Sequence, residues 1–169
     1  MGALFIWWKK DWVQLRRFSA SVLLLTIAFA ASSQERQAFL RVHNDARAIV
    51  GVGPLQWSDK LAAHAQEWAN HLAQSGKFEH RPNNRYGENL AAFTAAESPE
   101  YAARLWLGER NDYHGERIDG RNFHKFGHYT QMIWRHTTHV GYGVSRMRNG
   151  TWIVVANYEP AGNVVGEHP

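Results

Sequence analysis

Histidine dominates the residues of this sequence that could do chemistry. Ten histidines and 15 acidic residues are spread over 169 residues, and cysteine is absent. Histidine is the commonest metal ligand and titrates near neutral pH, so the composition allows a histidine–carboxylate site that binds a metal or transfers protons. The absence of cysteine excludes a thiolate nucleophile, a thiolate metal site and a disulfide framework.

Spacing along the chain does not show which histidines converge. His124 and His128 are four residues apart, but a glycine between them disfavours the continuous helix that would let both bind one ion. His64 and His71 share one predicted helix face, where we expect surface positions. His43 lies in an apolar stripe, so we expect it to be buried and hydrogen-bonded. Composition therefore supports a site and does not locate it.

Other function classes are excluded by motif and by charge. The sequence lacks the H-E-x-x-H motif of zinc proteases, the G-x-S-x-G motif of serine hydrolases and the glycine-rich nucleotide-binding loops. The net charge is +4, but four of the 19 basic residues and only one of the 15 acidic residues fall within residues 1–30. The remainder is nearly neutral, so we expect no nucleic acid partner, which would need a concentrated basic face.

The first 30 residues read as a secretory signal peptide. Four basic residues precede an apolar run over residues 20–31, which contains Ala28-Phe29-Ala30, an A-x-A-like cleavage site. The run is shorter than the roughly 20 residues that a membrane-spanning helix needs. We expect cleavage, no stable membrane span in the mature chain, and a secreted extracellular protein (periplasmic or at the cell surface if bacterial). The alternatives are an uncleaved anchor and a start codon assigned too far upstream.

Two helices are predicted to open the mature chain. Apolar residues at three- and four-residue spacing predict an amphipathic helix over residues 34–50. The second helix follows the N-cap Ser58 and ends at Gly76. Its predicted buried stripe is Leu61, Ala65, Trp68 and Leu72.

The second half of the chain is predicted to hold a helix, a loop and a hairpin. The third helix begins near Ser98, and the polar stretch 113–126 is a loop. The residues that this helix should present are Ala102, Leu105, Trp106 and Glu109. Two β-rich runs over residues 139–147 and 151–158 flank Asn149-Gly150, which favours a hairpin with a type I′ turn. Helices combined with few strands indicate an α+β or three-layer arrangement.

Four short segments resemble the signatures of one superfamily, in the same order along the chain. They are His43-Asn44-x-x-Arg47, Gly87-Glu88-Asn89-Leu90, Gly127-His128-Tyr129-Thr130-Gln131-x-x-Trp134 and Asn157-Tyr158-Glu159-Pro160-Ala161-Gly162-Asn163. Residues 34–169 thus resemble a CAP domain, the domain of cysteine-rich secretory proteins, antigen 5 and plant pathogenesis-related class 1 proteins. The segment Gly51-Val52-Gly53-Pro54-Leu55-x-Trp57 is closest to the plant branch. The resemblance implies an α+β fold, a three-layer α-β-α sandwich, and an extracellular protein.

The resemblance also implies a ligand cavity made of His80, Glu88, Glu109 and His128. His80 and Glu88 match the histidine before the G-E-N motif and the glutamate within it. Glu109 matches the glutamate of a W-x-x-E helix, and His128 belongs to the G-H-Y-T-Q signature. Zinc, or another divalent metal, would be held by His80 and His128 with the glutamates behind them. The alternative is a metal-free tetrad in which each carboxylate accepts a proton from a histidine.

The chain departs from the superfamily in its cysteines. Family members carry several disulfides, and three of their cysteines would fall at Phe126, Tyr142 and Ala156 here. We interpret the replacements as apolar packing in place of cross-links, each of which stabilises a small domain by a few kcal/mol.

Three functions stay open at this point. The chain could be a module that binds a sterol or another lipid near the loop 113–126. It could instead be a metal-dependent hydrolase, a protease or esterase, that uses the same cavity, although we can name no nucleophile and assign no catalytic residue. It could also be a defence or host-interaction protein that contacts a protein partner.

One further motif lies at the predicted hairpin tip. Asn149-Gly150-Thr151 matches the N-x-T acceptor sequence for N-glycosylation. The alternative is that Asn-Gly is present only because a type I′ turn requires positive φ at both residues.

Overall fold

The computed structural model describes residues 33–95 and 98–169. The predicted signal peptide over residues 1–30 therefore lies outside the described residues. Residues from Arg36 to Pro169 form one compact unit. Among the described helices, none combines the length and the apolar character that a membrane span requires.

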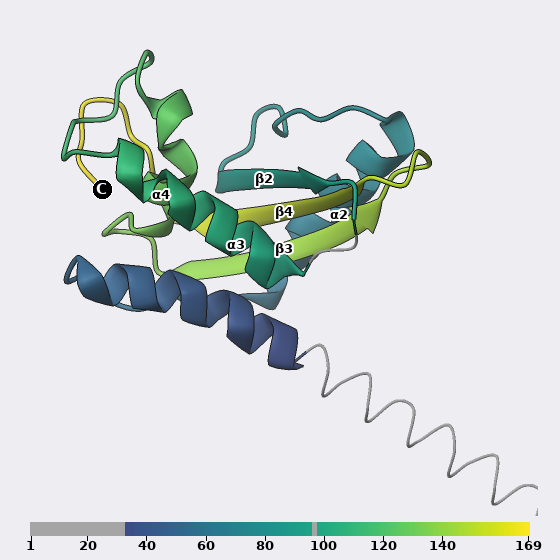
Figure 1. The fold of residues 1–169 in the computed structure, drawn as a ribbon, viewed down its shortest axis with the longest axis horizontal. Helices are drawn as coiled ribbons and strands as arrows, with labels where there is room; N and C mark the ends of the chain where they lie inside the picture. The colour runs from purple at the N-terminus through teal and green to yellow at the C-terminus, as the bar shows by residue number, and fades with distance from the viewer. Residues whose placement is uncertain (1–32, 96–97) are drawn as a thin grey trace, which may run out of the picture. The chain divides into compact units, whose positions relative to one another are not determined.

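A four-stranded sheet forms the middle of this unit (Figure 1). Its strands, in the order β1-β3-β4-β2, are β1 (Gln56–Trp57), β3 (His139–Arg146), β4 (Trp152–Glu159) and β2 (Gly87–Phe93). The two-residue β1 pairs in parallel with β3, and the other two pairings are antiparallel. The hairpin of β3 and β4 thus occupies the centre of the sheet.

Helices cover both faces of the sheet. Helix α2 (Asp59–Ser75) lies on one face, behind the sheet in Figure 1, and packs against Ile153 and Val155. Alternate residues of β4 face the other way, where they pack with the helix at residues 33–49, α3 (Pro99–Gly108) and α4 (Gly127–Met132). The α+β fold and the three-layer α-β-α sandwich are therefore confirmed.

Two glycines bring α2 and β3 into backbone contact. A Cβ atom on Gly141 would lie 2.3 Å from the backbone nitrogen of Ala62, and one on Gly143 would lie 2.3 Å from the Cα of Gln66. Because no side chain separates the two backbones, α2 is seated directly on the sheet.

The ends of α2 agree with the local signals in the sequence. The Ser58 hydroxyl accepts a hydrogen bond from the Leu61 amide at 3.3 Å, and Gly76 has a left-handed φ of 71°. The predicted stripe of α2 is buried. In α3, however, Leu105 is 47% exposed, so only Ala102 and Trp106 of its predicted apolar face reach the core.

Two structural features differ from the sequence expectations. Strand β2 was not predicted, because Gly87–Phe93 lacks alternating β-branched residues. The hairpin turn is also not type I′. The non-glycine residues with positive φ in the described chain are Asn83 and Asn163, and Asn149 is not one of them. Gly150 alone, at φ 91°, takes the left-handed conformation, which is typical of a type I turn followed by a glycine bulge.

Candidate functional site

His80 and Glu88 form the first of two histidine–glutamate pairs. The Nδ1 atom of His80 donates to Oε1 of Glu88 at 2.8 Å. The Glu88 side chain is only 5% exposed, whereas that of His80 is 62% exposed. Strand β2 places Glu88 opposite Asn157 of β4, so its carboxylate faces into the fold.

The Glu88 carboxylate is fully occupied by donors. Its Oε1 also accepts from the Arg81 amide at 3.0 Å. Its Oε2 accepts from the side-chain amides of Asn84 at 3.1 Å and Asn157 at 3.4 Å. Four donors satisfy both oxygens, so Glu88 orients His80 and has no lone pair clearly available for a metal.

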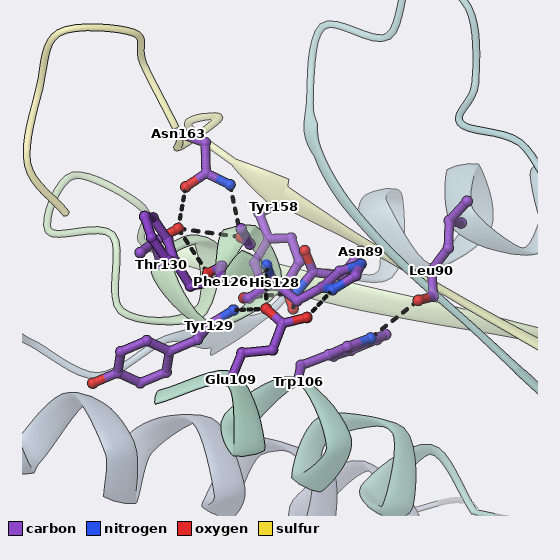
Figure 2. Close-up of polar contacts among 11 residues, drawn as sticks. Asn89, Leu90, Trp106, Glu109, Phe126, His128, Tyr129, Thr130, Tyr158 and Asn163 are labelled. Carbon is purple, nitrogen blue, oxygen red and sulfur yellow. Dashed lines mark hydrogen bonds and ion pairs between the residues drawn. The ribbon is translucent and has the colours of Figure 1, made fainter. Parts of the chain in front are cut away.

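Glu109 and His128 form the second pair (Figure 2). The Nδ1 atom of His128 donates to Oε1 of Glu109 at 2.6 Å. Oε2 accepts from the backbone amides of His128 at 2.9 Å and Tyr129 at 3.2 Å, in the first turn of α4. Trp106, one turn before Glu109, stacks on the His128 ring at 6.1 Å between centroids. One helix segment therefore fixes both the tautomer and the plane of His128.

The two histidines open onto one cavity. It has a volume of about 340 Å³, and its lining residues are His80, Glu88, Asn89, Phe123, His124, Gly127, His128 and Asn163. Both rings use Nδ1 to hold a glutamate, and neither Nε2 atom has a hydrogen bond to a described residue. Two imidazole Nε2 atoms are thus left for a ligand. Within the described residues no cluster of three or more histidine, aspartate or glutamate side chains could hold a metal.

The sequence-predicted residues are therefore placed as two pairs. His80, Glu88 and His128 line the cavity, whereas Glu109 lies behind His128. His124 also lines this cavity, although it belongs to a short 3-10 helix, Phe123–Lys125, that is separate from α4. The continuous helix through His124 and His128 is absent, as the glycine suggested.

A buried polar chain runs from the cavity into the core. The Asn89 side-chain amide donates to the His128 carbonyl at 3.0 Å and to the Tyr158 hydroxyl at 3.2 Å. Tyr158 contacts Nε2 of His43 at 2.9 Å, and Nδ1 of His43 donates to the Phe39 carbonyl at 2.9 Å. Burial lowers the pKa of His43 to about 4, so the ring is neutral at pH 7. Burial likewise raises the pKa of Tyr158.

Arg47 is a buried cation that sequence reasoning did not assign. Its guanidinium donates to four backbone carbonyls: Gly53 at 2.6 Å, Met132 and Trp134 at 2.9 Å, and Thr137 at 2.8 Å. The side chain is 1% exposed, and no described carboxylate forms an ion pair with it. Burial lowers its pKa to about 10, which still leaves it charged at pH 7. Its place in the His43-Asn44-x-x-Arg47 motif was the signal that could have found it.

The remaining histidines with predicted roles behave as structural or surface residues. His43 is fully buried and hydrogen-bonded, as expected. His64 contacts Asn84 at 3.3 Å on the flank of α2. His71 stacks on Trp68, with 4.5 Å between ring centroids.

A second cavity adjoins the first. It has a volume of about 540 Å³ and shares His80, Glu88, Phe123 and Asn163 with the smaller one. Apolar side chains contribute to its wall at Ile118, Phe123 and Val165, and polar ones at Arg81 and Asn84. Phe123 and Val165 are 47% and 72% exposed. The combined surface is therefore amphipathic.

The comparisons with known proteins agree with this architecture. Residues 40–158 match the profile of the CAP family, described as the cysteine-rich secretory protein family. The chain belongs to this family. The CAP match contains Glu109 and His128 as well as His80 and Glu88, and ends at Tyr158.

Several curated relatives of the chain are plant proteins. Pathogenesis-related leaf protein 4 of Solanum lycopersicum is 40% identical over 152 residues, which cover 88% of this chain and 92% of the relative. Pathogenesis-related protein 1C of Nicotiana tabacum is 39% identical over 157 residues, with 89% and 90% covered. The chain is thus similar to defence-related CAP proteins over most of its length.

Solved structures share the fold. The one described as "Crystal structure of NaASP2 with Zn2+" superposes with a TM-score of 0.69 at 26% identity, covering 79% of this chain and 83% of the other. BmVAL-1 superposes with a TM-score of 0.65 at 25% identity, covering 80% and 81%.

Proposed function

We propose that this protein is a secreted, defence-related binding module whose cavity takes up a divalent metal, zinc, through His80 and His128. The observation that carries the proposal is the shared bonding of two residues that line one cavity: each ring gives Nδ1 to a glutamate, and neither Nε2 bonds to a described residue. A histidine that binds zinc usually donates its other nitrogen to a carboxylate in this way. The extracellular location rests on the N-terminal sequence and on the plant relatives.

The donor set fits a weak site. Two imidazole nitrogens are neutral ligands suited to zinc, and the saturated glutamates would act behind them and not on the ion. Solvent would complete the coordination, so modest affinity is expected. One solved relative, NaASP2, is described as a crystal structure with Zn2+.

The hydrolase alternative has less support. Neither His80 nor His128 contacts a serine or threonine hydroxyl among the described residues, and both rings bond only to glutamate. A nucleophile activated by a base would need such a contact. We therefore assign no catalytic residue.

Calorimetric titration of chelator-treated protein with zinc chloride tests the metal site. We expect binding in the wild type and its loss in the double variant His80→Ala, His128→Ala. The matched control is His71→Ala, His136→Ala, which removes two exposed histidines that line neither cavity and should leave the heats unchanged. Binding should weaken on acidification, because a protonated imidazole cannot ligate. Equal heats from the wild type and the cavity variant would place zinc elsewhere and end the proposal.

The neighbouring amphipathic cavity favours a lipid as a second ligand. Its 540 Å³ combine the exposed side chains of Phe123 and Val165 with polar groups, which suits a sterol that has one hydroxyl and an apolar body. Co-elution of a radiolabelled sterol with the wild type, and its loss in Phe123→Ser, is the expected result. Equal retention by both proteins would remove this cavity as the sterol site.

A further inference from the structure

The tip of the β3–β4 hairpin presents an exposed asparagine side chain. Asn149 and Arg148 are both exposed there. The Asn149 Oδ1 accepts a hydrogen bond from the Thr151 amide at 3.0 Å. Its Nδ2 has no hydrogen bond with any described residue, so the amide nitrogen is free to react.

The φ angle at position 149 does not require asparagine, although the side chain accepts the Thr151 amide. The Gly150 amide donates to the Met147 carbonyl at 3.0 Å, and the Met147 amide donates to the Thr151 carbonyl at 2.8 Å. Gly150 supplies the only left-handed φ of the turn, at 91°. The reason for Asn-Gly that the sequence suggested, positive φ at both positions, does not hold at Asn149.

Asparagine, glycine and threonine at these positions form the acceptor triplet for N-glycosylation. The triplet occurs once in the whole sequence, so the chain offers one acceptor. The hydrogen bond from the Thr151 amide to Oδ1 folds the threonine back toward the asparagine side chain while Nδ2 stays accessible. The folded tip therefore accommodates a substituent on Nδ2 without disturbing the packing of the hairpin.

We infer that Asn149 carries an N-linked glycan, an inference that rests on the proposed passage through a secretory route. The donor is a lipid-diphosphate-linked oligosaccharide. A bond forms between Nδ2 of Asn149 and C1 of the first sugar, while the bond from C1 to the diphosphate oxygen breaks. The lipid diphosphate leaves with the electron pair, and one amide proton is released.

The glycan would stand far from the cavity. Strand β4 leads from the tip, at Trp152, to Glu159, and Asn163 soon after it lines the cavity. Eight residues of strand at about 3.4 Å each separate the two ends by about 25 Å. Glycosylation should therefore leave zinc binding unchanged, which separates this inference experimentally from the metal site.

Expression of the full chain in cultured plant cells tests the inference. We expect the secreted protein to be heavier than its sequence without the cleaved signal peptide. An N-glycosidase should remove the excess mass and leave aspartate at position 149, visible by tandem mass spectrometry. Asn149→Gln and Thr151→Ala should both abolish the excess mass, whereas Thr151→Ser should retain it. Circular dichroism and thermal unfolding of the variants check that they are folded.

A second version, with a proven plant signal peptide in place of residues 1–30, distinguishes the two ways to fail. If this version is secreted with the mass of the mature sequence alone, the glycosylation inference is overturned. If it is glycosylated while the natural N-terminus gives no secretion, the acceptor site stands and the proposed route of export fails.

Discussion

His43 couples the stability of the fold to pH at the scale of a single residue. The ring is completely buried and bonded at both nitrogens, to Phe39 and Tyr158. Its pKa falls from 6.5 to about 4 because burial disfavours the charged form. Between pH 6.5 and about 4, His43 is protonated in the unfolded chain and neutral in the folded chain. The free energy of unfolding therefore decreases as pH falls through this range.

We expect His43 to contribute about 3 kcal/mol of stability above pH 6.5 that is lost as pH falls to 4. Urea unfolding at several pH values measures this change. The variant His43→Gln should show a shallower decline over this range, because glutamine takes up no proton on unfolding. The contributions of acidic residues are common to both proteins and cancel in the comparison.

His71→Gln is the matched control, since His71 lies on the flank of α2 and stacks on Trp68. It should keep the pH dependence of the wild type. If His43→Gln also keeps that dependence, then the acid sensitivity arises from other groups.

Residue roles were predictable where one side chain sits in a clear pattern. The apolar stripe around His43 predicted its burial correctly. Arg47 lies four residues further on, but its carbonyl partners Met132, Trp134 and Thr137 come some 90 residues later. No local pattern contains that information.

At the scale of the element, the close packing of α2 on β3 depends on Gly141 and Gly143, which have no side chain. We expect Gly143→Ala to destabilise the protein by about 3 kcal/mol or more, because the new Cβ would lie 2.3 Å from the Gln66 backbone and must push the helix away. The midpoint of chemical unfolding measures the effect.

Gly108→Ala is the control for the same chemical change. Nothing lies within 4 Å of a Cβ at Gly108, and α3 is helical there, so stability should be unchanged or rise by up to about 1 kcal/mol. Similar midpoints for the two variants would show that α2 and β3 can separate without penalty.

The elements differ in how much of their signal is local. Helix α2 was predicted to its end residues because Ser58 and Gly76 act on their own neighbours. Strand β2 was missed because Gly87–Phe93 becomes a strand through its pairing with β4, residue by residue from Tyr158 back to Trp152. The prediction of a type I′ turn was wrong for a related reason. Asn-Gly is compatible with a type I′ turn and with a type I turn followed by a glycine bulge, and the pairing of the flanking strands decides between them.

At the scale of the whole molecule, apolar clusters occupy places where the superfamily would have cysteines. Phe126 packs with Ile118, Trp134 and Tyr113 in a cluster apart from the two larger ones. Ala156 is buried, and it lies opposite Tyr142 in neighbouring strands. The cluster around Phe126 ties the loop before α4 to the segment after it.

We expect Phe126→Ala to cost about 3–5 kcal/mol of stability, since it empties a fully buried site. Phe126 directly precedes α4, which carries His128. If His128 binds zinc as proposed, the affinity for zinc should also fall in this variant. Thermal unfolding and the zinc titration measure the two effects.

Phe123→Ala supplies the comparison, because Phe123 is 47% exposed and its loss should cost less than about 1 kcal/mol. A small effect at Phe126 would mean that this cluster does not replace a cross-link.

The candidate site was predictable only in part. The resemblance named His80, Glu88, Glu109 and His128, but it did not specify which atom each glutamate holds. The loop between α2 and β2 brings His80 to Glu88. Glu109 begins the 3-10 helix Glu109–Asp112 that follows α3, and packing of these two helices against α4 brings it to His128. Those pairings, and the saturation of Glu88 by amides, follow from tertiary structure.

The four backbone carbonyls that accept hydrogen bonds from Arg47 also determine when the first helix can pack during folding. The guanidinium lies near the end of the first helix, whereas its last acceptor, the Thr137 carbonyl, is added 90 residues later. Until that residue has been synthesised, a buried Arg47 would be a charge without its acceptors, which strongly opposes burial. The first helix therefore cannot dock early, and consolidation waits for most of the chain. Such dependence on long-range contacts gives a high contact order and slow folding.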